Sequence, residues 1–230
     1  MTYARYNLTD QQAAFFATLP TTAAIMAILS KQPPEGWYLE HEDGNSVVFS
    51  EPDNPGNKVN IKPPFPTGEV GLREAWRARY YYLTGKYYQY KADWGENEPD
   101  DCLVGWYSAQ CMPPKAIRHH YRVTDSRVCR VREVTYNDIE SMGYTLIYDQ
   151  YLNPIDSTFR QSFTARYSTP RPVIKGGIER YRCYAWDKAS AIKRLVGKYS
   201  SAIPDTWKDK PLEIIINPYV QVAGIERIEP

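Results

Sequence analysis

The chain has 230 residues, of which 43% are hydrophobic and 24% are charged. This length and composition suit one large domain, or one domain with additions, and differ from those of a disordered chain. The formal net charge is +1, so the overall charge argues neither for nor against a polyanionic partner.

The sequence gives no sign of a membrane span, a secretory leader or a metal site. No apolar run approaches the roughly 18 residues that a spanning helix requires, and residues 1–14 are too polar for a signal peptide. The four cysteines are unevenly spaced and lack a CxxC pair, which favours reduced thiols over zinc or a disulfide framework. We therefore expect a cytoplasmic protein without membrane contact, metal or cofactor.

The first 36 residues are predicted to form a helical addition to the main fold. Residues 9–17 and 21–29 each begin with a threonine that can cap a helix, and Pro20 separates them. Two prolines and a glycine then break the chain at residues 32–36.

A hairpin and a further strand are predicted next. Residues 37–41 and 46–50 flank Glu42-Asp43-Gly44-Asn45, which is a strong hairpin signal. Residues 57–62 alternate between apolar and polar side chains and stop at a group of three prolines. We expect all three segments to be strands.

Residues 106–144 are predicted to organise the fold. Two prolines at 113 and 114 make a rigid corner. The β-branched and aromatic residues of 117–123 and 128–134 then predict a hairpin that turns at 124–126. A short helix capped by Thr135 is predicted to follow and to end at Gly143.

The remaining residues divide into an insertion and a closing segment. Residues 145–185 are polar, aromatic and rich in X-Pro steps, which predicts irregular loops with a hairpin across Gly176-Gly177. Residues 187–198 have helical spacing, and Ala191, Ile192, Leu195 and Val196 form the face expected to pack on the fold. Residues 212–216 and 219–228 are expected to finish the sheet.

Positive charge is concentrated in the predicted hairpin of residues 117–134 and just before it. The basic residues from 115 to 132 are Lys115, Arg118, Arg122, Arg127, Arg130 and Arg132, against the single acid Asp125. Strand alternation would place Arg118 with Arg122, and Arg130 with Arg132, so the ribbon would carry a positive face. The alternative is a solvated face whose arginines pair with carboxylates elsewhere.

Aromatic residues flank this predicted ribbon in the sequence. The chain has 20 tyrosines and 6 tryptophans. Trp76 and Trp106 are candidates for stacking on single-stranded or flipped bases beside the arginines. Core packing would explain most of the aromatic residues equally well, and Trp76 in particular can belong to the core.

Four groups of residues occur in an order that is typical of one family. They are Gly68-Glu69 with Leu72-Arg73-Glu74 and Trp76; Tyr90, Ala92 and Asp93; Met112-Pro113 with Ala116, Arg118, Val123-Thr124 and Gly143; and Asn217-Pro218-Tyr219-Val220 with Val222 and Ile225-Glu226. In this order they resemble the phage and prophage branch of the ASCH domain family. The matches cover most of residues 56–144 and the end of the chain.

The resemblance implies a single α+β domain over residues 1–230, built as a small, mostly antiparallel PUA-like β-barrel with peripheral helices and insertions. It places Lys58, Arg73 and Arg118 around a pocket at the barrel mouth. Glu74 forms a charged pair with Arg73 in an otherwise apolar strand, so it is a further candidate for this site. A phage origin would make the expected location the cytoplasm of the host cell.

The same resemblance bears on catalysis. Enzymes of this family that remove the acetyl group from N4-acetylcytidine are understood to use a lysine, a threonine and a glutamate. Lys31 and Lys58 are candidates for the lysine, and Lys58 is preferred because of Gly56 and its distance from Thr67-Gly68.

Residues 59–61 contain no threonine, however, and Met142 occupies the glutamate position. Glu140 lies two residues earlier and points to another side of the helix. The catalytic set looks incomplete, so the sequence leaves open whether the protein is an enzyme.

We therefore expect a binding module for RNA or for a modified base or nucleotide. One alternative is an enzyme, either an N4-acetylcytidine-type amidohydrolase or a ribonuclease. Another is a phage factor that binds a host protein of defence or transcription. The incomplete catalytic set favours binding over catalysis, and the near-neutral charge keeps the protein partner open, because a fold alone does not determine function.

Overall fold

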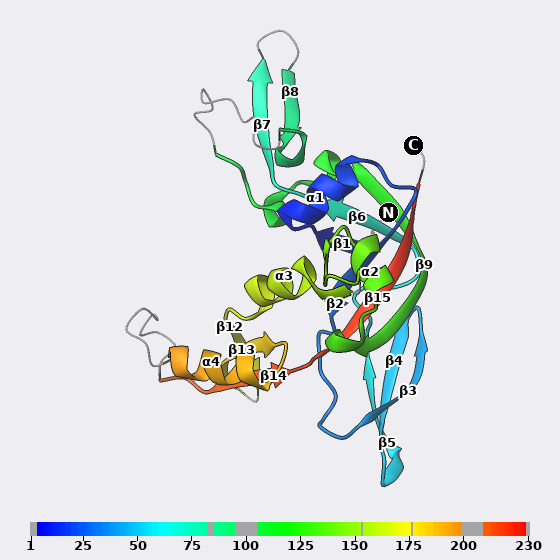
Figure 1. Cartoon of the computed structure of the whole chain (residues 1–230), viewed down its shortest axis with the longest axis vertical. Helices are drawn as coiled ribbons and strands as arrows, with labels where there is room; N and C mark the ends of the chain where they lie inside the picture. The colour runs from blue at the N-terminus through cyan, green and yellow to red at the C-terminus, as the bar shows by residue number, and fades with distance from the viewer. Residues whose placement is uncertain are drawn as a thin grey trace.

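A five-stranded sheet forms the centre of the protein, in the order β1-β6-β9-β15-β2. The computed structural model describes residues 4–81, 85–94, 105–152, 154–175, 177–198 and 209–228. The five strands are β1 (Ala4–Asn7), β6 (Glu69–Arg73), β9 (His119–Arg130), β15 (Tyr219–Arg227) and β2 (Thr22–Ile28). β1 and β6 are parallel, and the other neighbouring pairs are antiparallel. The sheet curls into a half-barrel with few helices around it (Figure 1), which confirms a strand-rich α+β class.

The central strand β9 is one continuous strand of 12 residues. The predicted hairpin of 117–123 and 128–134 is therefore wrong. Thr124 is an extra residue between the partners of Gly224 and Ile225 and makes a β-bulge. Turn-forming residues here bend the strand instead of reversing it, because β6 and β15 pair with β9 on either side.

The N-terminal segment supplies strands to this sheet as well as a helix. Helix α1 (Asp10–Ala17) is confirmed, and Thr9 caps it as predicted. The helix predicted at 21–29 is wrong, since Thr22–Ile28 is strand β2, paired along its length with β15. Helix propensity is a weak preference that tertiary contacts override. Four consecutive residues, Ala23 to Met26, are buried here, which suits a strand at the interior of the fold. The segment 1–36 is thus not a purely helical addition.

Two smaller sheets lie at opposite ends of the molecule (Figure 1). One contains β3 (Tyr38–Asp43), β4 (Ser46–Glu51) and β5 (Asn54–Ile61), which confirms the predicted hairpin and the strand after it. The other is the hairpin of β7 (Trp76–Tyr81) and β8 (Gly85–Tyr90), which the sequence did not predict.

The segment after Gly143 is more regular than expected. It forms a two-stranded sheet of β10 (Leu146–Tyr148) and β11 (Pro154–Ser157), then helix α3 (Thr158–Tyr167). A three-stranded sheet of β12 (Arg171–Lys175), β13 (Ile178–Ala185) and β14 (Leu212–Ile216) completes the segment. The hairpin of β12 and β13 is confirmed. β14 joins β13 and not the central sheet, a correction to the predicted closing strands, while β15 is confirmed there.

Two further α-helices are α2 (Tyr136–Ser141) and α4 (Lys188–Lys198). Short 3-10 turns occur at Lys91–Asp93, Ala109–Cys111, Pro114–Ala116 and Val131–Glu133. The predicted face of α4 is covered only in part, because Ala191 is buried whereas Ile192 and Leu195 are 54% and 44% exposed. No helix in the described residues is long and apolar enough to cross a membrane.

Helix α2 and its end are confirmed, and Gly143 explains why this end tolerates no larger residue. Thr135 caps α2 in a capping box with Asp138. Gly143 has φ +81°, and a Cβ there would lie 2.5 Å from the Cβ of Phe15 on α1. Gly143 therefore provides both a left-handed turn and the space for α1.

We expect Gly143→Ala to lower the free energy of unfolding by at least about 2 kcal/mol, since it combines left-handed strain with overpacking. Urea denaturation measures this loss. The matched control is Gly36→Ala, because Gly36 has φ +85° but open space around its Cβ position. Equal losses in the two variants would show that the contact with Phe15 contributes nothing.

Candidate nucleic-acid interface

Glu74 lies in the two-residue link between β6 and β7 and is 1% exposed. Its carboxylate accepts two hydrogen bonds from Arg118, from Nε at 2.8 Å and from Nη2 at 3.0 Å. Nε2 of the buried His119 lies 3.2 Å from the same carboxylate. The predicted candidates Glu74 and Arg118 therefore do lie together, as an ion pair whose carboxylate is buried and whose guanidinium is partly exposed.

Arg118 is fully engaged within the protein. Besides Glu74, its guanidinium bonds Asp93, with Nη1 at 2.9 Å and Nη2 at 2.7 Å from the carboxylate oxygens. It also lies 4.1 Å above the ring of Tyr90, whose hydroxyl donates to the Ala116 carbonyl. The arrangement ties the start of β9 to the β6–β7 link and leaves Arg118 few donors for a ligand.

The charges of this pair stabilise one another. Burial by itself would raise the pKa of Glu74, but the contacts with His119 and Arg118 outweigh burial and lower that pKa below its usual 4.5. Burial opposes the charge of Arg118 too, yet Glu74 and Asp93 raise the pKa of Arg118. The pair is therefore ionised at neutral pH and acts as a structural clasp.

The two candidate tryptophans stack on protein groups. Trp76 is 8% exposed and packs with Tyr88 and Tyr107, so it belongs to a small core, as its alternative interpretation held. Trp106 is half-buried and lies against the guanidinium of Arg77 at 4.1 Å.

The arginines of the predicted ribbon are dispersed along β9 and beyond it. Arg122 lies between Glu69 and Glu226 of the neighbouring strands. Arg130 covers the ring of Tyr219 and donates to the Asn217 carbonyl, and Arg132 is exposed on the 3-10 turn that follows.

In addition, Arg127 pairs with Asp138 of α2. Because β9 is not a hairpin, the predicted two-stranded basic ribbon does not form. The contacts of Arg118 and Arg127 fit the alternative of arginines that pair with carboxylates elsewhere.

Lys58 does not join the other candidates. It lies on β5, where its ammonium is 2.6 Å from Glu40, and β5 is at the opposite end of the molecule from β7 (Figure 1). Met142, at the position of the family glutamate, is buried in the core, and Glu140 is exposed.

A cavity of about 510 Å³ lies beside the clasp, lined by Leu19, Glu69, Arg118, His119, His120, Arg227 and Ile228. Both signs of charge are present in its lining, and Arg118 is already neutralised. This cavity therefore carries no excess of positive charge.

An open groove of about 500 Å³ differs in this respect. Residues 7–10 between β1 and α1, the loop 108–110 and the end of α3 line it, with Thr169 and Arg171 at one end. Asp10 is the single carboxylate of the lining, and it already pairs with Lys91 at 2.7 Å. We call this hollow the arginine groove, after Arg166 and Arg171.

Neither arginine of the groove has a carboxylate partner among the described residues. Arg166 is half-buried and lies 5.2 Å from the ring of Tyr6 and 5.5 Å from that of Tyr167. Arg171 is exposed, with no hydrogen bond or ion pair to the described part of the chain. The local charge of the groove is therefore positive.

The predicted candidate Arg73 adds to this positive charge. It is the last residue of β6 and donates from Nη1 to the carbonyl of Gln110 in the groove wall, at 3.0 Å. Burial and the nearby Arg5 lower the pKa of Arg73. An anion in the groove would relieve this repulsion.

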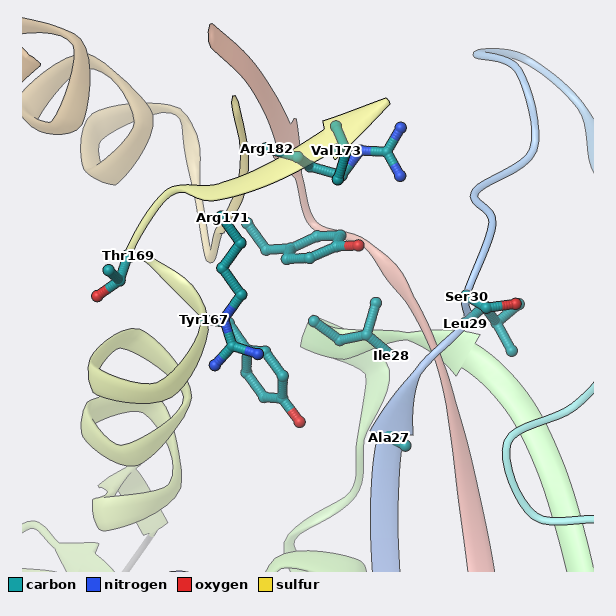
Figure 2. A pocket seen from close by; sticks show the side chains of 10 residues that line it. Ala27, Ile28, Leu29, Ser30, Tyr167, Thr169, Arg171, Val173 and Arg182 are labelled. Carbon is teal, nitrogen blue, oxygen red and sulfur yellow. The ribbon is translucent and has the colours of Figure 1, made fainter. Parts of the chain in front are cut away.

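Thr169 and Arg171 also line a second cavity, of about 330 Å³ (Figure 2), so the groove and this cavity are neighbours. Tyr167 and Tyr184 give it aromatic walls, and Ala27, Ile28 and Val173 give it apolar ones. Sequence patterns missed this region. The available signal was the i, i+4 spacing of Phe159, Phe163 and Tyr167, which predicts a helix with one apolar face.

Searches of family models, of curated proteins and of solved structures gave no match to this chain. The resemblance to the ASCH family therefore stays a prediction, and function must be argued from the site. In the described residues no cluster of three or more His, Cys, Asp or Glu side chains is placed to hold a metal ion.

We expect Glu74→Gln to lower the free energy of unfolding by about 2 kcal/mol, because a buried carboxylate loses its charge-assisted hydrogen bonds to Arg118. The folded-state pKa of Glu74 is lowered, so its contribution to stability is present above about pH 4.5 and is lost as pH falls through the folded pKa. Denaturation at several pH values should show this acid-dependent loss in the wild type and less of it in the variant.

Glu40→Gln is the control for this prediction, since the Glu40 and Lys58 pair is exposed to solvent. It should change stability little. A Glu74→Gln variant as stable as Glu40→Gln would contradict the role of the clasp.

Proposed function

We propose that the protein binds RNA, or a modified base or nucleotide, in the arginine groove. The observation that carries this proposal is that Arg166 and Arg171 line one groove without a carboxylate partner in the described residues. Arg166 is half-buried, and a charge without a carboxylate partner is costly where solvent is partly excluded. A phosphate offers either arginine a bidentate, charge-assisted partner.

The chemistry of the groove wall suits a sugar-phosphate backbone. The hydroxyls of Thr9, Ser108 and Thr169 and the amides of Asn7 and Gln110 line it. The side-chain oxygen of Asn7 is buried and has no hydrogen-bond partner among the described residues. Such groups can donate to phosphate oxygens or accept from a ribose hydroxyl.

The distribution of charge favours this groove over the predicted ribbon. Arg118, Arg127 and Arg130 already contact carboxylates, a carbonyl or aromatic rings. Arg166 lies beside the rings of Tyr6 and Tyr167, but neither it nor Arg171 has a carboxylate partner in the described part of the chain. A polyanion therefore gains more at the groove.

The motif order supports a second part of the proposal. We propose that the half-barrel is a PUA-like sheet of the ASCH type, that the protein is of phage or prophage origin, and that it acts in the host cytoplasm. The curled, mostly antiparallel sheet is consistent with this fold.

Fluorescence anisotropy with a labelled single-stranded RNA, at about 50 and about 200 mM salt, tests the binding proposal. We expect binding to weaken as salt rises. The magnitude of the slope of log K against log salt concentration, here called the salt slope, should fall by about 0.7 in each of Arg166→Ala and Arg171→Ala, because each variant removes one phosphate contact on a single strand.

Two matched variants complete this test. Arg160→Ala changes the same residue type on α3, but Arg160 already pairs with Asp187, so binding should stay as in the wild type. Arg132→Ala removes an exposed arginine of the former ribbon and should also have little effect. If the salt slope fell in Arg132→Ala but not in Arg171→Ala, the interface would lie at the end of β9 and not in the groove. That result would contradict the proposal.

A further inference from the structure

The cavity of about 330 Å³ beyond Arg171 has the shape and chemistry to receive a planar ring. It lies next to the arginine groove, since Thr169 and Arg171 line both hollows. A strand whose phosphates lie in the groove would therefore have a nucleotide close to the cavity.

The walls of this cavity are aromatic and apolar. The rings of Tyr167 and Tyr184 meet edge to face, with centroids 6.3 Å apart. Ile28 of β2 and Val173 of β12 lie across from them and are half-buried, so part of the apolar surface is open to a ligand. In Figure 2 the side chain of Arg171 lies beside the Tyr167 ring, between that ring and Thr169.

The hydroxyl side chains of Ser30 and Thr169 belong to the lining of the cavity. Ser30 and Thr169 are exposed on opposite sides (Figure 2). Neither hydroxyl has a hydrogen bond to the described part of the chain. A ring inserted between the apolar walls could exchange hydrogen bonds with them along its edge.

We propose that this cavity takes one unstacked base of a single-stranded nucleic acid, with the adjoining phosphate on Arg171. This inference rests on the proposed binding in the arginine groove and narrows its ligand to a strand with an extruded base. A base paired within a duplex is stacked on both faces and cannot enter a closed pocket without leaving the helix.

Removal of single bases from the ligand tests this inference directly. In a series of labelled single-stranded oligonucleotides, each lacks the base at one position but keeps every phosphate. We expect binding to weaken by about 5- to 140-fold at one position in the series, the equivalent of losing one aromatic stacking contact. The salt slope should not change, because the phosphates are retained.

A blocking variant links this effect to the cavity. Val173→Trp should fill the cavity, so the intact oligonucleotide should bind no better than its weakest abasic form. The matched control is Ile174→Trp on the same strand, because Ile174 is 81% exposed and does not line the cavity. This control should bind like the wild type.

The outcomes separate the two proposals. Equal affinity for intact and abasic strands, or unchanged binding by Val173→Trp, would overturn the base pocket and leave the arginine groove standing. No binding of any strand at low salt would overturn both. Tighter binding to a duplex than to a single strand would also contradict the base pocket.

Discussion

The fold depends on the pairing of β9 with β6 and β15, which places one long strand at the centre of the curled sheet. The bulge at Thr124 bends this strand, and Gly224 opposite it leaves room, since a Cβ there would lie 2.0 Å from Asp125. At the N-terminal end of β9 the Glu74–Arg118 clasp secures the β6–β7 link. At its other end the chain turns into α2, and β2 on the far side of β15 reaches the cavity of Figure 2.

Charged side chains are paired in the scaffold, whereas the arginines of the groove have no carboxylate partner among the described residues. Glu74, Arg118 and Asp93 neutralise one another within the scaffold, and the lowered pKa of Glu74 shows that the contacts outweigh the cost of burial. Arg166 and Arg171 have no carboxylate partner within the ranges that the structure describes. This contrast matters because a chain of net charge +1 can attract a polyanion only where positive charge is locally concentrated. The groove between α1 and α3 is such a place.

The sequence predicted local structure where the signal was local. The Thr135 cap, the Gly143 turn and the Gly44-Asn45 hairpin depend on neighbouring residues, and each was identified. The hairpin predicted around residues 124–126 and the helix predicted at 21–29 failed for a shared reason: pairing with distant β15 overrides a turn signal in one case and helix propensity in the other.

The sequence predicted only part of the site, because the rest depends on contacts between distant residues. Arg73, Glu74 and Arg118 were identified from motif order, and the last two do meet. Sequence alone could not show that Arg118 is already neutralised by Glu74 and Asp93. Nor could it show that Arg171, from a segment without a recognised counterpart, lines one groove with residues of β1 and α1 and has no carboxylate partner in the described residues. Both facts depend on contacts between residues far apart in the chain.

The central claim is that the arginine groove and its cavity, and not β9, contact nucleic acid. Photocrosslinking of a 4-thiouridine-substituted single-stranded RNA, followed by mass spectrometry of the crosslinked peptides, tests it most directly. The account predicts crosslinks in the segment 166–184, around Tyr167, Arg171 and Tyr184. Crosslinks confined to 118–132, or none at saturating RNA, would contradict it.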